Sequence, residues 1–310
     1  RSLMGIPADY DVIFLQGGAT QLFSTIPMNF LAAGAGHPAS ADFVVTGEWA
    51  KKAAEAAKPY GKANVLASSE ATGFDRIPTG WKASADASYL HICTNNTIYG
   101  TRWSQIPDHP CLIADMSSEI MARVVDVSKF ALIYAGAQKN LGPSGVVMAI
   151  VRKDLYARVP KTVPKIFSFQ AHAEAKSCLN TPPTFGIYLL LETFRWLERQ
   201  GGIAAMESRN EEKAKLIYDA IDTSKGFYRG TVSDVPNRSR MNVTFRLPSD
   251  ELADAFIKQA EKQAMVALKG YRTVGGIRAS IYNAMPIAGC AALARFMAEF
   301  QGANAQAASA

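Results

Sequence analysis

Seven short apolar segments alternate with helix-patterned stretches over the first 200 residues, and this alternation constrains the fold more than any other feature of the sequence. The segments span residues 10–15, 43–46, 63–66, 89–93, 111–114, 130–134 and 146–151. Several are apolar at nearly every position, which is typical of strands that are buried on both faces. Stretches such as the Ala-rich residues 48–60 supply helices that cover those faces. The sequence therefore predicts an α/β fold with a mostly parallel, seven-stranded sheet.

The pattern changes after a long helix that we predict over residues 185–200. Gly201 and Gly202 end that helix, and three further helices at 203–221, 250–265 and 286–300 then flank only two clear strands, 241–246 and 277–281. We therefore expect a large α/β domain over residues 1–201 and a small α+β domain over residues 202–310.

Composition excludes several classes of protein. With 310 residues, of which 48% are hydrophobic and 19% are charged, the chain can bury a large core and is not disordered, collagenous or coiled-coil. Its four cysteines are isolated in the sequence, which argues against a zinc site and favours a reducing compartment. No apolar run approaches the roughly 20 residues of a membrane span. We expect a cytoplasmic protein with no membrane, metal or nucleic-acid partner, since the net charge of +6 comes with no nucleic-acid-binding motif.

The first candidate for a binding function is the sequence Gly17-Gly18-Ala19-Thr20, between the first predicted strand and the helix that follows it. Free backbone N–H groups at a helix N-terminus bind anions, and small residues let a phosphate approach closely. Glycines at such a position also serve as simple turn formers. The motif is neither a Rossmann fingerprint nor a Walker A loop.

Two ionisable residues follow neighbouring predicted strands. Asp115 directly follows residues 111–114, and Lys139 lies 24 residues later in a loop of small residues between the strands 130–134 and 146–151. Ligands of open α/β sheets bind outside the carboxyl ends of the strands, so both side chains can converge on one crevice. A desolvated lysine there can form a Schiff base. Taken singly, Asp115 is equally well explained as an N-cap. A loop lysine such as Lys139, taken singly, is far more often a solvated surface residue.

An anion cradle, a carboxylate and an amine, in that order, are the groups that pyridoxal phosphate requires. The cradle holds the phosphate, the carboxylate keeps the pyridine nitrogen protonated, and the lysine holds the aldehyde. Trp49 offers a flat apolar face for stacking on the ring, although a tryptophan is usually a core residue.

Six stretches of the sequence resemble, in order, the class V pyridoxal-phosphate-dependent aminotransferases, and within them the family of the phosphoserine aminotransferases. These stretches are residues 17–20, 95–100, 114–118, 135–143, 180–184 and 276–284. The resemblance runs over essentially the whole chain. It implies a fold-type I transferase with pyridoxal 5'-phosphate as its cofactor.

The resemblance implies roles for the residues around the cofactor ring. Lys139 forms the Schiff base with the cofactor and moves the proton between the substrate Cα and the cofactor. Asp115 pairs with the pyridine nitrogen, Trp49 stacks on the ring, and Thr97 hydrogen-bonds the phenolic oxygen.

The resemblance also implies how the cofactor phosphate is bound. The backbone amides of Ala19 and Thr20 bind it together with the side chain of Gln138. In the family, the pair that corresponds to Asn180 and Thr181 reaches the phosphate of the neighbouring subunit's cofactor. The implied active unit is therefore a homodimer.

The substrates that the resemblance implies are glutamate and 3-phosphohydroxypyruvate, which give 2-oxoglutarate and O-phosphoserine. Arg278 would bind the substrate α-carboxylate, because a planar guanidinium is the usual clamp for that group. Arg272 and Tyr271 lie where the family binds the substrate phosphate, but the family has His in place of Tyr271. A phenol cannot become cationic as an imidazole can, so we expect this contact to be altered or lost. A structural salt bridge would be the default explanation of either arginine alone.

The chain begins at Arg1, without an initiator Met, and lacks several dozen residues that precede this point in the family, including a His-Arg segment that binds substrate. We therefore expect an N-terminally truncated form with reduced activity in serine biosynthesis. The alternatives are a catalytically impaired scaffold that still binds the cofactor, and another class V enzyme. A cysteine desulfurase would need a reactive loop cysteine, whereas Cys290 lies in a predicted helix and Cys178 precedes the Asn-Thr pair.

Overall fold

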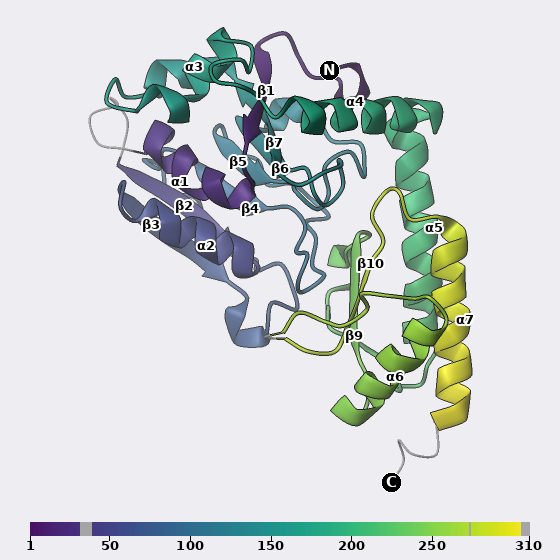
Figure 1. Cartoon of the computed structure of the whole chain (residues 1–310). Helices are drawn as coiled ribbons and strands as arrows, with labels where there is room; N and C mark the ends of the chain where they lie inside the picture. The colour runs from purple at the N-terminus through teal and green to yellow at the C-terminus, as the bar shows by residue number, and fades with distance from the viewer. Residues whose placement is uncertain (32–38, 273, 305–310) are drawn as a thin grey trace.

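The seven predicted strands form one sheet in the computed structural model, which describes residues 1–31, 39–272 and 274–304. The strands are β1 (Tyr10–Gln16), β2 (Ser40–Val45), β3 (Lys62–Ser68), β4 (Leu90–Cys93), β5 (Leu112–Asp115), β6 (Leu132–Gly136) and β7 (Val146–Arg152). Their order is β1-β7-β6-β5-β4-β2-β3 (Figure 1). Neighbours from β6 across to β3 pair in parallel, whereas β7 is antiparallel to both β1 and β6. The prediction of a mostly parallel, seven-stranded sheet is therefore confirmed.

Helices cover both faces of this sheet. On one face, α1 (Ala19–Phe30), α2 (Glu48–Ala57) and α3 (Phe169–Glu174) share a core with Ile113 of β5. On the other face, α4 (Thr184–Arg199) and the first turns of α5 (Gly202–Asp222) share a core with Leu112 and Ala114. Successive residues of β5 are thus buried on opposite faces, which explains why the strands lack polar–apolar alternation. Short 3-10 helices span Ser2–Met4, Glu70–Thr72, Val127–Lys129, Lys153–Arg158, Lys165–Phe167 and Val235–Asn237.

A second sheet contains three antiparallel strands, β8 (Arg229–Gly230), β9 (Asn242–Arg246) and β10 (Ile277–Ser280), in the order β10-β9-β8. The sequence predicts β9 and β10 to within one residue at each end. It misses β8, because two residues are too few to show a period. One face of this sheet packs on α5, α6 (Asp250–Lys262) and α7 (Ile287–Asn304). Figure 1 shows α5 and α7 running side by side over much of their length.

The other face of the small sheet carries polar residues. Val243 and Phe245 of β9 point into the helical core, so Thr244 between them points the other way, and its hydroxyl donates to the backbone oxygen of Tyr99. Arg278 of β10 lies directly opposite Thr244 across the pair of strands. Because opposite residues of paired strands share a face, Arg278 also lies on the polar face.

Helix α5 connects the two sheets. Ile203 and Met206 in its first turns belong to the core of the large sheet, whereas Ala214 and Ile217 belong to the core of the small one. Gly201 precedes the helix with a φ of 94°, a left-handed conformation that favours glycine. The domain boundary between residues 201 and 202 stays a prediction, since α5 contributes to both cores.

Candidate active site

Lys139 lies in the connection between β6 and β7, where its amine meets an aromatic ring and a hydroxyl. Its Nζ donates to Oγ1 of Thr97 at 2.6 Å and lies 5.3 Å from the centroid of the Trp49 ring. Burial lowers the pKa of Lys139 below its ordinary value of 10.5, while the nearby Asp115 acts to raise it and Arg278 to lower it. Four residues from separate parts of the chain are therefore brought to one amine.

Asp115 is the last residue of β5 and is only 4% exposed. Its Oδ1 accepts hydrogen bonds from the backbone N–H of Ser117 at 2.9 Å and from the Ser117 hydroxyl at 2.6 Å. The Ser117 Oγ in turn accepts from the backbone N–H of Gly136 at 3.0 Å, at the end of β6. The sequence analysis did not assign a role to Ser117, although a serine two residues after an aspartate is a recognisable turn signal. Asp115 thus both closes a local turn and faces the site.

The predicted anion cradle comes together at the end of β1. Because β1 and β6 are each antiparallel to β7, they point the same way and end at the same edge of the sheet. A Cβ placed on Gly136 would lie 3.3 Å from the backbone N of Ala19 and 2.8 Å from Oε1 of Gln138. The first residue of α1 and the side chain of Gln138 therefore flank one point. Gly18 caps α1 without a side-chain hydrogen bond, which leaves helix N–H groups for a ligand.

Trp49 lies close to the Lys139 amine and packs against the edge of one core of the large sheet. It is half-buried in the first turn of α2, with Lys52 5.0 Å and Lys139 5.3 Å from its ring centroid. Its Nε1 is buried without a hydrogen-bond partner in the described part of the chain. A buried indole N–H normally has a partner, so this orphaned donor is a feature that a bound group could satisfy.

Arg278 reaches the site from the polar face of the small sheet. Its Nε is buried and finds no partner among the described residues. Arg278 lines a pocket of about 240 Å³ with Tyr99 and Thr244, while a second pocket, of about 640 Å³, opens between Lys139 and Tyr282. Burial raises the pKa of Tyr282, and the nearby Arg278 partly offsets the rise. Tyr282 is in a stretch that the sequence singled out, but its place at the site was not predicted.

The other two predicted substrate residues lie in the loop before β10. Arg272 is exposed, and Tyr271 is half-buried with its backbone oxygen accepting from the N–H groups of Val274 and Gly275. Neither side chain contacts Lys139 among the interactions of the described residues. Their predicted role in binding the substrate phosphate stays untested by this geometry.

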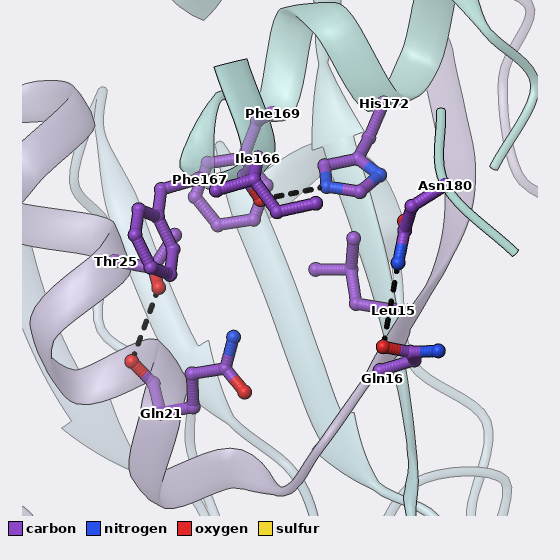
Figure 2. Close-up of a pocket in the computed structure, with 9 residues that line it drawn as sticks. All are labelled: Leu15, Gln16, Gln21, Thr25, Ile166, Phe167, Phe169, His172 and Asn180. Atoms are coloured by element: carbon purple, nitrogen blue, oxygen red, sulfur yellow. Dashed lines mark hydrogen bonds between the residues drawn. The ribbon is translucent and has the colours of Figure 1, made fainter. Parts of the chain in front are cut away.

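Asn180 and Thr181 lie beside the end of β1. Nδ2 of Asn180 donates to Oε1 of Gln16 at 3.3 Å, and Nε2 of Gln16 donates to the backbone oxygen of Thr181 at 2.8 Å. Figure 2 shows Asn180 pointing toward Gln16 at the rim of a small pocket of about 80 Å³, with Gln21 and His172 on its other sides. Among the described contacts within one chain, neither residue reaches Lys139. The geometry is compatible with their implied role toward a partner subunit, which it does not test.

Three further observations narrow the chemistry. Among the described residues, no group of three or more His, Cys, Asp or Glu side chains is placed to hold a metal ion. No helix in residues 1–31, 39–272 or 274–304 combines the length and apolar character needed to span a membrane. Cys290 is fully buried in α7, and burial raises the pKa of its thiol to about 11, which does not suit a nucleophile.

Comparison with known protein families identifies the class. The family described as "Aminotransferase class-V" matches residues 1–293, which is nearly the whole chain. The chain therefore belongs to the class V aminotransferases, which are enzymes that depend on pyridoxal phosphate. The predicted fold class and enzyme class are both confirmed.

Comparison with individual relatives identifies the family within this class. Phosphoserine aminotransferase of Bacillus subtilis is 49% identical over 304 residues, which cover 97% of this chain and 83% of that protein. The structure of phosphoserine aminotransferase from Bacillus circulans subsp. alkalophilus superposes with a TM-score of 0.94 at 48% identity, covering 98% of this chain and 84% of the other. A phosphoserine aminotransferase from Trichomonas vaginalis, solved with bound PLP, gives a TM-score of 0.87 at 36% identity, covering 96% and 85%. Within its class, the chain is a member of the phosphoserine aminotransferase family.

Proposed function

We propose that this protein transfers the amino group of glutamate to 3-phosphohydroxypyruvate, giving 2-oxoglutarate and O-phosphoserine, with pyridoxal phosphate as cofactor. The observation that carries the proposal is the setting of the Lys139 amine, which donates to Thr97 and lies 5.3 Å from the Trp49 ring centroid. Asp115 and Arg278 are close enough to this amine to influence its pKa. Each of these groups has a separate task in an aminotransferase, and the relatives named above supply the substrate class.

The residues present fit the proposed cofactor. Trp49 provides a ring to stack on and an indole N–H that has no partner in the part of the chain that the structure describes. The Ala19 amide and the Gln138 side chain flank a point at Gly136 where a Cβ would force its neighbours to shift, and this close approach of donors would suit a phosphate. Asp115 is a buried carboxylate held by Ser117, and it would keep a pyridine nitrogen protonated. When bound, pyridoxal phosphate supplies an electron sink for the charge that develops at the substrate Cα.

Lys139 would accept the proton from the substrate Cα. Burial lowers the pKa of its amine, so a larger share is neutral near neutral pH, and a neutral amine can accept the proton from the substrate Cα. Thr97 accepts a hydrogen bond from Nζ and thus fixes the direction in which the amine points. By resemblance, Thr97 would also hydrogen-bond the phenolic oxygen of the cofactor.

Arg278 would orient the substrate by its α-carboxylate. Its Nε has no hydrogen-bond partner among the described residues, and a guanidinium binds a carboxylate through two parallel hydrogen bonds. Arg272 would bind the distal phosphate, with Tyr271 in place of the family histidine. Because the phenol of Tyr271 carries no positive charge, we expect weaker binding of the phosphate than an imidazolium would give.

A homodimer would complete the site. Asn180 and Thr181 contact Gln16 of their own chain and leave room for the role that the resemblance implies, at the phosphate of a partner subunit's cofactor. Directly after them, α4 exposes Phe185 (73%), Tyr188 (54%) and Leu191 (41%) along one side of the helix. An exposed apolar face beside a site residue supports a second copy of this chain as its partner. Sedimentation of the wild type and of Phe185→Asp tests this, and a wild type that sediments as a monomer at micromolar concentration would contradict it.

The central experiment is to trap the cofactor. The purified protein should be yellow, lose its colour on treatment with borohydride, and carry the reduced adduct on Lys139 when its peptides are sequenced. A label on another lysine, or a protein that retains no pyridoxal phosphate, would overturn the proposal.

A second experiment separates the proposed reaction from its alternatives. Glutamate or phosphoserine should shift the absorption spectrum to that of the amine form, whereas cysteine should not. A protein that binds the cofactor but gives no shift would be the impaired scaffold. The reduced activity and cytoplasmic location expected from the sequence stay predictions, and half-reaction rates with glutamate close to those of the Bacillus enzymes would contradict the first.

A further inference from the structure

Three buried asparagines bind three consecutive backbone carbonyls in the segment after Asp115. Nδ2 of Asn140 donates to the oxygen of Ile120 at 2.7 Å. Nδ2 of Asn283 donates to the oxygen of Met121 at 2.9 Å, and Nδ2 of Asn210 to that of Ala122 at 2.9 Å. We call Asn140, Asn210 and Asn283 the asparagine clamp.

The asparagines of the clamp also bind one another. Oδ1 of Asn283 accepts from Nδ2 of Asn210 at 2.9 Å, and the backbone N–H of Asn283 donates to Oδ1 of Asn140 at 2.9 Å. All three are at most 7% exposed. A buried amide that loses its partner keeps the full cost of its desolvation, so these bonds strongly favour one arrangement.

The clamp joins the segments that carry Lys139, Asp115 and Arg278. Asn140 is the neighbour of Lys139 in sequence, and Asn283 follows the strand that bears Arg278 by three residues. The carbonyls that they bind belong to the loop that begins at Asp115. Asn210 attaches this assembly to α5, the helix that is shared by both cores.

Local backbone strain indicates that the clamp determines the shape of this loop. Met121, whose carbonyl accepts from Asn283, has a φ of 57°. This left-handed conformation is unfavourable for a residue with a long side chain and persists only where surrounding contacts enforce it. The three side-chain donors supply such contacts.

We propose that the asparagine clamp is a positioning device that holds the Lys139 amine, the Asp115 loop and the Arg278 strand in one fixed relation. Asn140 and Asn283 line the pocket beside Lys139, and the clamp acts by fixing the positions of Lys139, Asp115 and Arg278. The clamp keeps the carboxylate-binding arginine at the correct distance from the amine that takes the Cα proton. This inference rests on the proposed roles of Lys139 and Arg278.

The first test uses the protein without its cofactor and measures whether a substitution in the clamp changes hydrogen exchange in a segment that the clamp binds. Asn283→Ala loses the side-chain bonds of Asn283 to Met121 and Asn210 but keeps its backbone N–H. Hydrogen exchange should therefore become faster at the amides of Ile120 and Ala122, which donate to backbone oxygens in the segment after Asp115. Residues 120 and 122 are distant in sequence from the substitution, so a change there reports coupling. Unchanged exchange at both amides would overturn the proposal.

The second test measures catalysis against a matched control. Asn29 is also fully buried, and its Nδ2 donates to the oxygens of Thr25 and Phe167, outside the clamp. We expect Asn29→Ala and Asn283→Ala to lower the melting temperature by similar amounts. Only Asn283→Ala should lower kcat/KM for glutamate, by about tenfold to a hundredfold, because small misplacements of reacting groups cost that much. Both variants should still be labelled on Lys139 by borohydride.

The outcomes distinguish this proposal from the one on which it rests. If Asn283→Ala keeps its cofactor on Lys139 and kcat/KM within twofold of the wild type, the clamp has no positioning role. An equal loss of kcat/KM in both variants would show a general effect of stability and would overturn it as well. A wild type that carries no label on Lys139 would overturn the proposed function and this inference with it.

Discussion

The large and the small sheet carry their functional residues in different places. In the large sheet, the site residues lie at or beyond the ends of the strands: Asp115 at the last position of β5, and Lys139 in the loop after β6. In the small sheet, Arg278 lies within strand β10 itself. The difference follows from how each sheet is covered. Helices bury both faces of the first, whereas helices bury only one face of the second.

Polar side chains occupy those positions of each sheet that do not enter an apolar core. A charged side chain inside β5 would enter one of two apolar cores, at a large cost in desolvation free energy. The strand ends are the positions of the large sheet where polar groups meet both backbone donors and a ligand. In the small sheet, every second residue of β9 and β10 faces away from the helices, so Thr244 and Arg278 reach the site without entering a core.

The largest effect is expected at the edge of the large sheet. Lys139→Ala should lower kcat by about 10²- to 10⁴-fold, the range for loss of a group that transfers a proton in the transition state. The matched control is Lys129→Ala, which removes a lysine that is exposed beside β6. Steady-state kinetics would check this. A Lys139→Ala enzyme with a kcat close to that of the wild type would contradict the proposed proton transfer by Lys139.

On the face of the small sheet, a substitution should affect substrate binding and spare the cofactor. Arg278→Ala should lower kcat/KM for glutamate by about 30-fold or more, the cost of leaving a charged partner unpaired. Arg76 is exposed, is paired with Asp75 and lines neither pocket of the site, so Arg76→Ala serves as the control. Loss of pyridoxal phosphate from Arg278→Ala would contradict the proposal that the large sheet binds the cofactor and the small sheet binds the substrate.

A pH-dependent effect on stability should arise where the two sheets are joined. Lys213 of α5 is fully buried and donates to the oxygens of Ile281 and Tyr282, and burial lowers its pKa to about 8. The unfolded chain, with an ordinary pKa of 10.5, then binds more protons than the folded one between pH 8 and 10.5. Stability therefore rises with pH across this window, by about 3 kcal/mol relative to Lys213→Met.

Urea unfolding of the wild type and Lys213→Met at pH 7 and pH 10 measures this difference. The control is Lys215→Met, which removes a lysine that is exposed on the same helix and paired with Asp219. Its difference from the wild type should stay constant with pH over this range. A constant difference for Lys213→Met as well would show that Lys213 titrates alike in the folded and unfolded chain.

The smallest effect is expected at Ser117, which acts on the site through Asp115. Ser117→Ala removes one of two hydrogen bonds to Oδ1 of Asp115 and leaves the backbone bond in place. Because a hydrogen bond to a charged group contributes about 1.5 kcal/mol, we expect kcat/KM to fall by about tenfold. Ser118→Ala is the control, since its hydroxyl bonds Asn95 and not Asp115. Equal effects of the two substitutions would indicate a loss of packing and not of the bond to Asp115.

Much of the fold and of the cofactor side of the site follows from local patterns. The strands of the large sheet are continuous apolar runs, and the glycine pair, Asp115 and Lys139 each follow one of them, so their common edge was predictable. The two-residue strand β8 left no periodic signal. The sequence also carried no signal for Ser117, Tyr282 and Asn283. A serine or an asparagine in an ordinary turn cannot be distinguished by sequence from one in a functional site.

Local sequence patterns were enough to predict the α/β class, the division into two kinds of sheet, and the groups that suit pyridoxal phosphate. These depend on the hydrophobic period and on the chemistry of single residues, which are properties of neighbours along the chain. Tertiary packing, in contrast, brings Trp49 to the amine of Lys139 and Arg278 close enough to influence the pKa of that amine. Tertiary packing also lets three distant asparagines bind one another. Such contacts link residues more than 70 positions apart, and they depend on the packing of whole elements that no local pattern encodes.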